Sequence, residues 1–225
     1  MKTNPDLFLH EELMLLALRD HKGTLATDNV EYVIAGALLS ELLLSGKIAV
    51  QEEKKKRIEV LDTTPTGNPV VDEALAAIHE ARRPATIQDW VSRLAEIRNL
   101  KDKVARGLCD KGILRAGEDK VLFLFTRKVY PEIDPGPEEA VIDRLYKAIF
   151  ERAGDEPPRT VILLSLARQA DLLKITFGKD KVKLKQDRIE RLTKGEMAGA
   201  ATGEAIEAIQ AALVAATVVP VIVTS

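Results

Sequence analysis

The most constraining feature of the chain is the run AGALLSELLL, residues Ala35–Leu44. It is apolar nearly all round a helix, and a helix of that kind is buried on every side. Thr27 or Asp28 can cap a helix that begins shortly afterwards, and Ser45-Gly46 can end it. The sequence therefore predicts a central, buried helix over residues 30–45.

Glu41 is the one carboxylate inside this apolar run. A buried carboxylate is costly unless it is paired or hydrogen-bonded. We therefore expect Glu41 to pair with an Arg or Lys, or to accept a hydrogen bond from a backbone amide. The alternative is a functional acid.

Other stretches show the apolar spacing of helices that pack on a core. Thr86 can cap a helix that runs through Trp90, the single tryptophan, which we expect in the core. Two segments, Lys47–Asp62 and Ile113–Phe125, predict β-hairpins that each follow a helix-ending glycine. The two units share one order of elements, a helix, a glycine and a hairpin, but have little residue identity. We call them the helix–Gly–hairpin pseudo-repeat. Further helices are expected over residues 7–18, 71–81, 138–153, 159–173 and 204–217.

The stretch Ile97–Phe125 combines a helix, a glycine and a hairpin. Apolar residues recur every three or four positions up to Leu108, which predicts an amphipathic helix. Lys111-Gly112 can end it, because glycine readily adopts the left-handed C′ conformation. The hairpin is expected to pair Ile113–Leu114 with Val121–Phe125 across an AGEDK turn. Cations expected on the open face of the helix, where they suit an anionic partner, are Arg98, Lys101, Lys103 and Arg106.

Composition limits the kinds of partner. The formal net charge is −2 and the isoelectric point is near 6.0, so binding to a polyanion must come from a local patch. Hydrophobic residues make up 46% and charged residues 30%, a globular balance rather than a disordered one. A single cysteine excludes an internal disulfide and fits a reducing compartment such as the cytoplasm.

No segment reads as a signal peptide or a membrane span. His10, Glu11 and Glu12 stand where a secretory apolar region would be uncharged. No uncharged apolar run reaches about 18 residues. The nearest is Ala211–Ser225, which contains Pro220; we expect this tail to cap the core, with burial in a partner as the alternative.

Motifs that carry catalytic chemistry are absent. The sequence contains no GxxxxGK[ST], GxGxxG, HExxH or GxSxG. Its three histidines are far apart and its one cysteine cannot build a zinc site. Adjacent carboxylates on a helix point about 100° apart and make poor acid–base pairs. We therefore expect no catalytic residue, no metal and no cofactor, and the protein is not predicted to be an enzyme.

Several motifs occur together along the chain. They are LD…PTG…DEAL over residues 61–75, P-x-T-[VI]-Q-x-W over 84–90, R-N-[VL]-[RK] over 98–101 and L-x-[DE]-K-G-[VI]-L over 108–114. In combination with LFLHEELMLLALRDHKGT and GALLSELLLSGKI, they resemble the Golgi phosphoprotein 3 family. The resemblance is clear from about Asp6 to Phe177 and weak beyond. The sequence resembles a divergent member of the family, and a bacterial host is one option for it.

The resemblance implies a fold and a function. The fold is mainly α: a single domain over residues 6–225, with a central helical bundle and peripheral β-hairpins. The function is that of a peripheral membrane protein that binds phosphatidylinositol 4-phosphate and acts as an adaptor for membrane-protein tails, on the cytosolic face of the Golgi in eukaryotic members. The hairpin, with Phe123 and Phe125, is implied in membrane contact and in forming a homo-oligomer.

The family's lipid site carries over only in part. Arg98 and Lys101 match its two helix cations, with Lys103 and Arg106 as neighbouring candidates. Ala26 and Ala35 stand where the family has a Trp and an Arg, so both of those contacts are lost. The resemblance thus implies half of the lipid site on a retained scaffold, with a phosphoinositide or another anionic lipid as the ligand.

Two other functions stay open. A protein–protein adaptor on the same scaffold needs no lipid site and predicts self-association. The helix–hairpin units also resemble winged-helix DNA-binding domains. The isoelectric point and the acidic pair Glu118-Asp119 in the would-be wing argue against DNA, so we expect no nucleic-acid partner.

Overall fold

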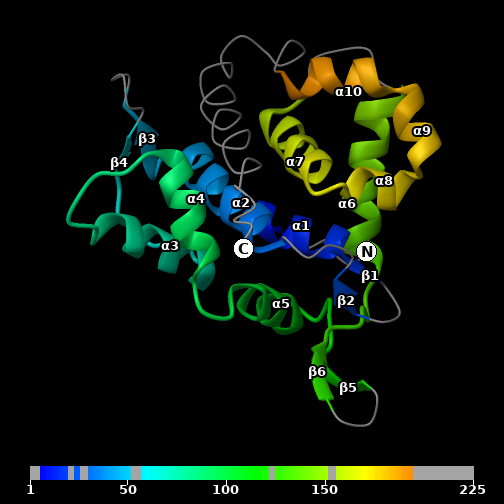
Figure 1. The fold of residues 1–225 in the computed structure, drawn as a ribbon, viewed down its shortest axis with the longest axis horizontal. Helices are drawn as coiled ribbons and strands as arrows, with labels where there is room; N and C mark the ends of the chain where they lie inside the picture. Colours follow the sequence, from blue (N-terminus) through cyan, green and yellow to red (C-terminus); the bar gives the residue numbers. More distant parts are fainter. Residues whose placement is uncertain are drawn as a thin grey trace, which may run out of the picture.

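Two helices form the centre of the molecule (Figure 1). The computed structural model describes residues 6–19, 23–25, 30–51, 57–121, 125–151 and 156–194. Helix α1, Leu9–Ala17, is buried along its whole length, and α2, Val30–Leu44, is buried over most of it. Between them they contact most of the other helices that the structure describes. The central helix predicted from AGALLSELLL is confirmed.

The other helices surround this pair on two sides (Figure 1). One group follows α2 in the chain and the other follows the last hairpin. Trp90, in the group that follows α2, is 3% exposed, so its predicted core position is confirmed. The first group is α3 (Pro69–His79), α4 (Ile87–Ala95) and α5 (Leu100–Asp110). The second is α6 (Gly136–Tyr146), continued by the π-helix η1 (Lys147–Glu151), then α7 (Pro158–Gln169), α8 (Leu172–Phe177), α9 (Lys179–Leu184) and α10 (Gln186–Thr193).

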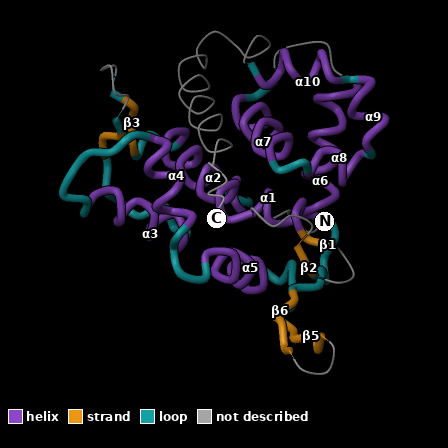
Figure 2. Tube along the Cα trace, viewed as in Figure 1, coloured by secondary structure: helices purple, strands orange, loops and turns teal. Residues whose placement is uncertain are grey.

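Strands in the described residues form only small antiparallel pairs, all at the periphery (Figure 2). This confirms the predicted fold class, a mainly α single domain with peripheral hairpins. The strand pairs are β1 (Leu18–Arg19) with β2 (Thr24–Leu25), β3 (Ile48–Val50) with β4 (Ile58–Val60), and β5 (Gly117–Val121) with β6 (Phe125–Val129).

The helix predicted over residues 204–217 and the tail at 211–225 lie outside the described residues.

The two predicted glycine stops share one geometry. Gly46 and Gly112 have φ of 67° and 72°, in the left-handed region. After α5, the Gly112 amide donates to the Cys109 carbonyl at 2.9 Å and the Ile113 amide to the Leu108 carbonyl at 3.0 Å. The amides after α2 make the same pair of bonds. These are Schellman caps, which satisfy the last carbonyls of each helix, and the helix–Gly–hairpin pseudo-repeat is confirmed.

The predicted register of the last hairpin is wrong. The segment GEDKV is strand β5, not a turn, and Ile113 and Leu114 lie in the core before it. In β5–β6, Glu118 faces Lys128 and Asp119 faces Arg127, whose guanidinium contacts the Asp119 carboxylate at 2.7 Å. Opposite charges on neighbouring strands stabilise strand pairing. Rules based on turn residues alone do not include such cross-strand pairs.

The helix predicted over residues 159–173 is two helices. Asp171 adopts a left-handed conformation with φ of 57° and separates α7 from α8. The apolar spacing runs on through the break because Leu172 and Leu173 are buried as well. Periodicity alone therefore could not locate the turn.

Glu41 is paired and hydrogen-bonded, as expected for a buried carboxylate. It accepts hydrogen bonds from the Arg159 guanidinium at 3.0 and 3.1 Å and from the Leu9 amide at 2.8 Å. Both expected partners, a cation and a backbone amide, are thus present. The contacts join α2 to the start of α1 and to α7.

His10 is fully buried on α1, and neither ring nitrogen hydrogen-bonds to any residue that the structure describes. Burial, reinforced by the positive charges of Lys111 and Arg159, lowers the pKa of His10 from 6.5 to about 3. The ring is therefore neutral in the folded protein at neutral pH.

We expect the folded state to lose stability as the pH falls from 6.5 towards 3. Over this range the unfolded chain takes up a proton on His10 that the native state does not. One such proton changes the free energy of unfolding by about 1.4 kcal/mol per pH unit. In urea unfolding, His10→Leu should remove this slope, whereas His79→Leu at an exposed position should keep it. Parallel curves for wild type and His10→Leu would contradict the assignment.

Candidate functional site

The start of α5 is the centre of the candidate site. The predicted amphipathic helix through Ile97 is broken here, because Asn99 is left-handed with φ of 57° and α5 begins only at Leu100. Arg98 therefore lies in the turn between α4 and α5, and Lys101 in the first turn of α5. The prediction that Arg98 and Lys101 share one helix face is wrong, although the turn keeps them three residues apart at one helix end.

The helix end itself favours an anion. The Asn99 side chain makes no capping hydrogen bond to the first turn of α5. The exposed amides and the dipole at a helix N-terminus attract negative charge. Arg98 is exposed and forms no ion pair with any described residue. It is thus the cation most available to a ligand at this end.

Lys101 has a competing partner. Its ammonium lies 3.0 Å from the Glu31 carboxylate in the first turn of α2. About half of the Lys101 side chain is exposed, so the pair is a surface ion pair of modest strength. An anionic ligand at Lys101 must displace or share this contact.

A pocket of about 380 Å³ opens beside Lys101. It lies between α5, the β1–β2 pair and strand β6. The basic side chains around it are Lys101, Arg127 and Lys128, and Asp102 and Tyr130 are its acidic and phenolic groups. The remaining wall is formed by Met14, Leu18, Gly23, Thr24, Leu25 and Ala105.

Asp102 organises the far side of this pocket. The Lys128 ammonium lies 2.5 Å from one carboxylate oxygen, and the Tyr130 hydroxyl donates to the other at 3.0 Å. Burial alone would raise the pKa of Asp102, but these two hydrogen bonds hold it below its usual range. Burial and the neighbouring Asp102 charge raise the pKa of Tyr130 to about 12. Asp102 is therefore ionised and Tyr130 protonated at neutral pH.

The two neighbouring candidates lie away from the pocket lining. Lys103 turns towards α3, where its ammonium contacts Glu73 at 2.6 Å. Arg106 is exposed one turn further along α5, close enough for its charge to act on Asp102 and Tyr130. Neither joins Arg98 and Lys101 in one cluster.

The other predicted site positions contribute less. Ala35 is fully buried on α2 and cannot supply a cation. Ala26 and Phe123 lie outside the described residues. Phe125 begins β6, where it pairs with Val121. The roles of Phe123 and Phe125 in membrane contact stay predictions.

Sequence reasoning missed the residues that β6 brings to the site. Arg127 and Lys128 stand next to each other in the sequence, just after the apolar FLF segment. Only the antiparallel return of β6 places Lys128 against Asp102, 26 residues away. Glu31 was also missed, although its position in the first turn of α2 is typical of a helix-capping acid.

The described residues contain no cluster of His, Cys, Asp or Glu suited to a metal ion. Within that same part of the chain, no helix is both long enough and apolar enough to cross a bilayer.

Comparison with known proteins identifies the family of this chain. The family model described as Golgi phosphoprotein 3 (GPP34) matches residues 9–209. The chain belongs to the Golgi phosphoprotein 3 family. The match extends well past Phe177, where the motif resemblance weakens.

Two fungal relatives are similar over about two thirds of the chain. Vacuolar protein sorting-associated protein 74 of Eremothecium gossypii is 32% identical over 169 residues, which is 66% of this chain. The protein of the same name in Schizosaccharomyces pombe is 28% identical over 172 residues, or 67% of this chain. In both cases the aligned part is 50% of the relative. The chain thus spans about half the length of the relatives it matches.

Proposed function

We propose that this member of the Golgi phosphoprotein 3 family is a peripheral membrane protein that binds anionic lipid headgroups at the N-terminus of α5. Phosphoinositides, with phosphatidylinositol 4-phosphate first among them, are the ligands that the family resemblance favours. The protein then acts as a binding adaptor at a cytoplasmic membrane surface rather than as an enzyme.

One observation carries the proposal: Arg98 and Lys101 flank an uncapped helix N-terminus beside a pocket that Arg127 and Lys128 also border. A phosphate at this point meets backbone amides, the helix dipole and charge-assisted donors together. Its neighbours reduce the net charge, because Glu31 pairs with Lys101 and Asp102 with Lys128. The site therefore suits selective binding of a headgroup better than broad attraction to any polyanion.

Self-association through the hairpin belongs to the same proposal. Figure 1 shows β5 and β6 extending away from the helices next to α5. A two-stranded pair leaves two strand edges able to pair with another chain. A homo-oligomer formed in this way would bring several lipid sites to one membrane and strengthen binding by multivalency. Glu118 and Asp119 lie on β5, so the hairpin is a poor wing for DNA.

We expect Arg98→Ala/Lys101→Ala to bind anionic vesicles about 30-fold more weakly than wild type. Each Lys or Arg near an anionic surface contributes about 1 kcal/mol. The measurement is co-sedimentation with phosphatidylcholine vesicles, with and without phosphatidylinositol 4-phosphate or phosphatidylserine. The matched control is Arg82→Ala/Lys147→Ala, which removes the same charges at positions that do not line the pocket. Arg82 is exposed like Arg98, and Lys147, like Lys101, is partly exposed and forms a surface ion pair.

Equal binding of wild type to neutral and anionic vesicles would overturn the lipid proposal. The second candidate function, a protein–protein adaptor without a lipid site, would then take its place. Equal weakening in the two double variants would instead show that net charge, not the α5 site, drives binding.

Glu31→Gln is expected to strengthen binding to anionic vesicles about two- to fivefold. The change frees Lys101 from its surface ion pair, and such pairs are worth up to about 1 kcal/mol. Glu80→Gln, at an exposed position after α3, makes the same charge change and is the control. A gain of equal size in both variants, or none with Glu31→Gln, would show that Glu31 does not compete with the ligand.

A further inference from the structure

A second basic region lies in helices α7 to α10, away from α5. Residues 168–194 contain nine Lys and Arg against four Asp and Glu, a local charge of +5 in a chain whose net charge is −2. Maintaining such an excess in a folded surface has an electrostatic cost through mutual repulsion. An anionic ligand would relieve it.

The turns between these helices bring the cations together. Asp171, with φ of 57°, turns α7 into α8, and Gly178, with φ of 86°, turns α8 into α9. The chain then returns so that α10 contacts α7. Figure 1 shows the four helices closing around one region at the edge of the molecule.

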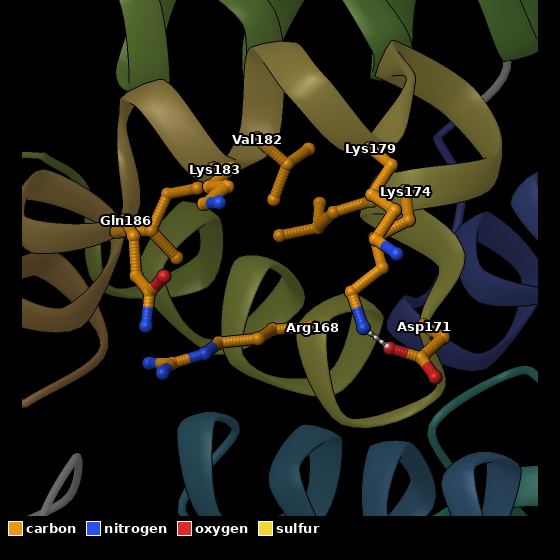
Figure 3. A pocket seen from close by; sticks show the side chains of 9 residues that line it. Arg168, Asp171, Lys174, Lys179, Val182, Lys183 and Gln186 are labelled. Atoms are coloured by element: carbon orange, nitrogen blue, oxygen red, sulfur yellow. Dashed lines mark hydrogen bonds and ion pairs between the residues drawn. The ribbon is translucent and has the colours of Figure 1, made fainter.

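The region encloses a pocket of about 390 Å³ (Figure 3). Its apolar wall consists of Leu173, Val182 and Ile189. Polar side chains stand around that wall: in Figure 3 the Arg168 guanidinium and the Gln186 amide point to the same side of the pocket. The cations that line it are Arg168, Lys174, Lys179 and Lys183, with Asp171 as the single acid.

Internal acids neutralise little of this charge. Lys174 contacts Asp171 at 2.5 Å. The Arg168 guanidinium donates to the Thr193 hydroxyl at 2.9 Å, a neutral acceptor. Lys179 and Lys183 are exposed and pair with no residue that the structure describes. The contrast with the α5 site is clear, because there Lys101 and Lys128 each face a carboxylate.

We propose that this pocket is a second anion-binding site, which takes a phosphate-bearing headgroup with Lys179, Lys183 and Arg168 as its donors. The apolar wall favours a ligand that joins a phosphate to a less polar ring or chain. Two sources have this chemistry, an anionic lipid and a free phosphorylated small molecule. The exposed Leu184 on α9 and Ile175 on α8 favour the lipid, since both can enter a membrane interface.

The test compares two pairs of lysines on one short segment. Lys179→Ala/Lys183→Ala removes two pocket residues, and Lys181→Ala/Lys185→Ala removes the same charge outside the pocket lining. Both pairs are made in the Arg98→Ala/Lys101→Ala background, which weakens the α5 site, so that the difference between the two pairs reports on the second site. Far-ultraviolet circular dichroism confirms that each variant is folded.

Two probes distinguish the sources of the ligand. Calorimetric titration with inositol 1,4-bisphosphate measures binding of the free headgroup. Co-sedimentation with phosphatidylcholine vesicles containing phosphatidylinositol 4-phosphate measures binding of the lipid. We expect the pocket pair to weaken binding at least about tenfold relative to the control pair, a difference of about 1.4 kcal/mol. Selective loss with vesicles alone assigns the lipid, and selective loss with the soluble headgroup assigns the free compound.

The proposal is overturned if the two lysine pairs weaken binding equally, or if neither probe binds in this background. Those results do not bear on the proposal for the α5 site, because that site is tested by comparing wild type with Arg98→Ala/Lys101→Ala, both of which keep the wild-type α9. Conversely, if the α5 site fails its own test, a selective loss of binding in Lys179→Ala/Lys183→Ala can still be measured.

Discussion

Three buried carboxylates at the centre of the molecule hold its helices in place. Glu11 and Glu12 on α1 and Glu41 on α2 are at most 9% exposed. Their partners come from the surrounding helices: Lys111 after α5 lies 2.6 Å from Glu11, Arg144 on α6 2.8 Å from Glu12, and Arg159 on α7 3.0 Å from Glu41. Breaking a buried pair leaves an uncompensated charge and typically costs about 3–5 kcal/mol. Helices on both sides of the core are therefore tied to the same pair of central helices.

Glu11 connects this network to the candidate site. Besides Lys111, it accepts hydrogen bonds from the Phe8 amide at 2.9 Å and the Asn68 amide group at 3.3 Å. Asn68 is in turn the N-cap of α3. One carboxylate thus fixes the C-terminus of α5 and the start of α3. With the far end of α5 held by Glu11, its first turn presents Lys101, and the turn before it presents Arg98, at a defined position beside Glu31 and the pocket.

The sequence predicts the helical framework well because its signals are local. The AGALLSELLL run has to be buried, and Gly46 and Gly112 supply the left-handed stops that the structure contains. The class of partner for Glu41 was also predictable, since a carboxylate in an apolar run needs one. Its identity was not, because Arg159 lies 118 residues away.

The parts that sequence reasoning missed depend on contacts distant in the chain. The break at Asn99 is hidden because the apolar stripe continues through Ile97 and Leu100. The hairpin register depends on charge pairs such as Asp119 with Arg127, which a turn rule does not weigh. For the same reason the α5 site was predicted only as a row of helix cations, without Lys128 or the carboxylates that oppose it. The family resemblance named Arg98 and Lys101, and the structure adds their neighbours.

The central functional claim is that the N-terminus of α5 is the point of contact with an anionic membrane. Amide hydrogen exchange, measured on vesicles of phosphatidylcholine with and without phosphatidylinositol 4-phosphate, tests it most directly. We predict slower exchange at the amides of residues 98–103 and at Thr24 and Leu25, only on the anionic vesicles. Unchanged exchange at these amides on both kinds of vesicle, with the protein bound, would contradict the claim.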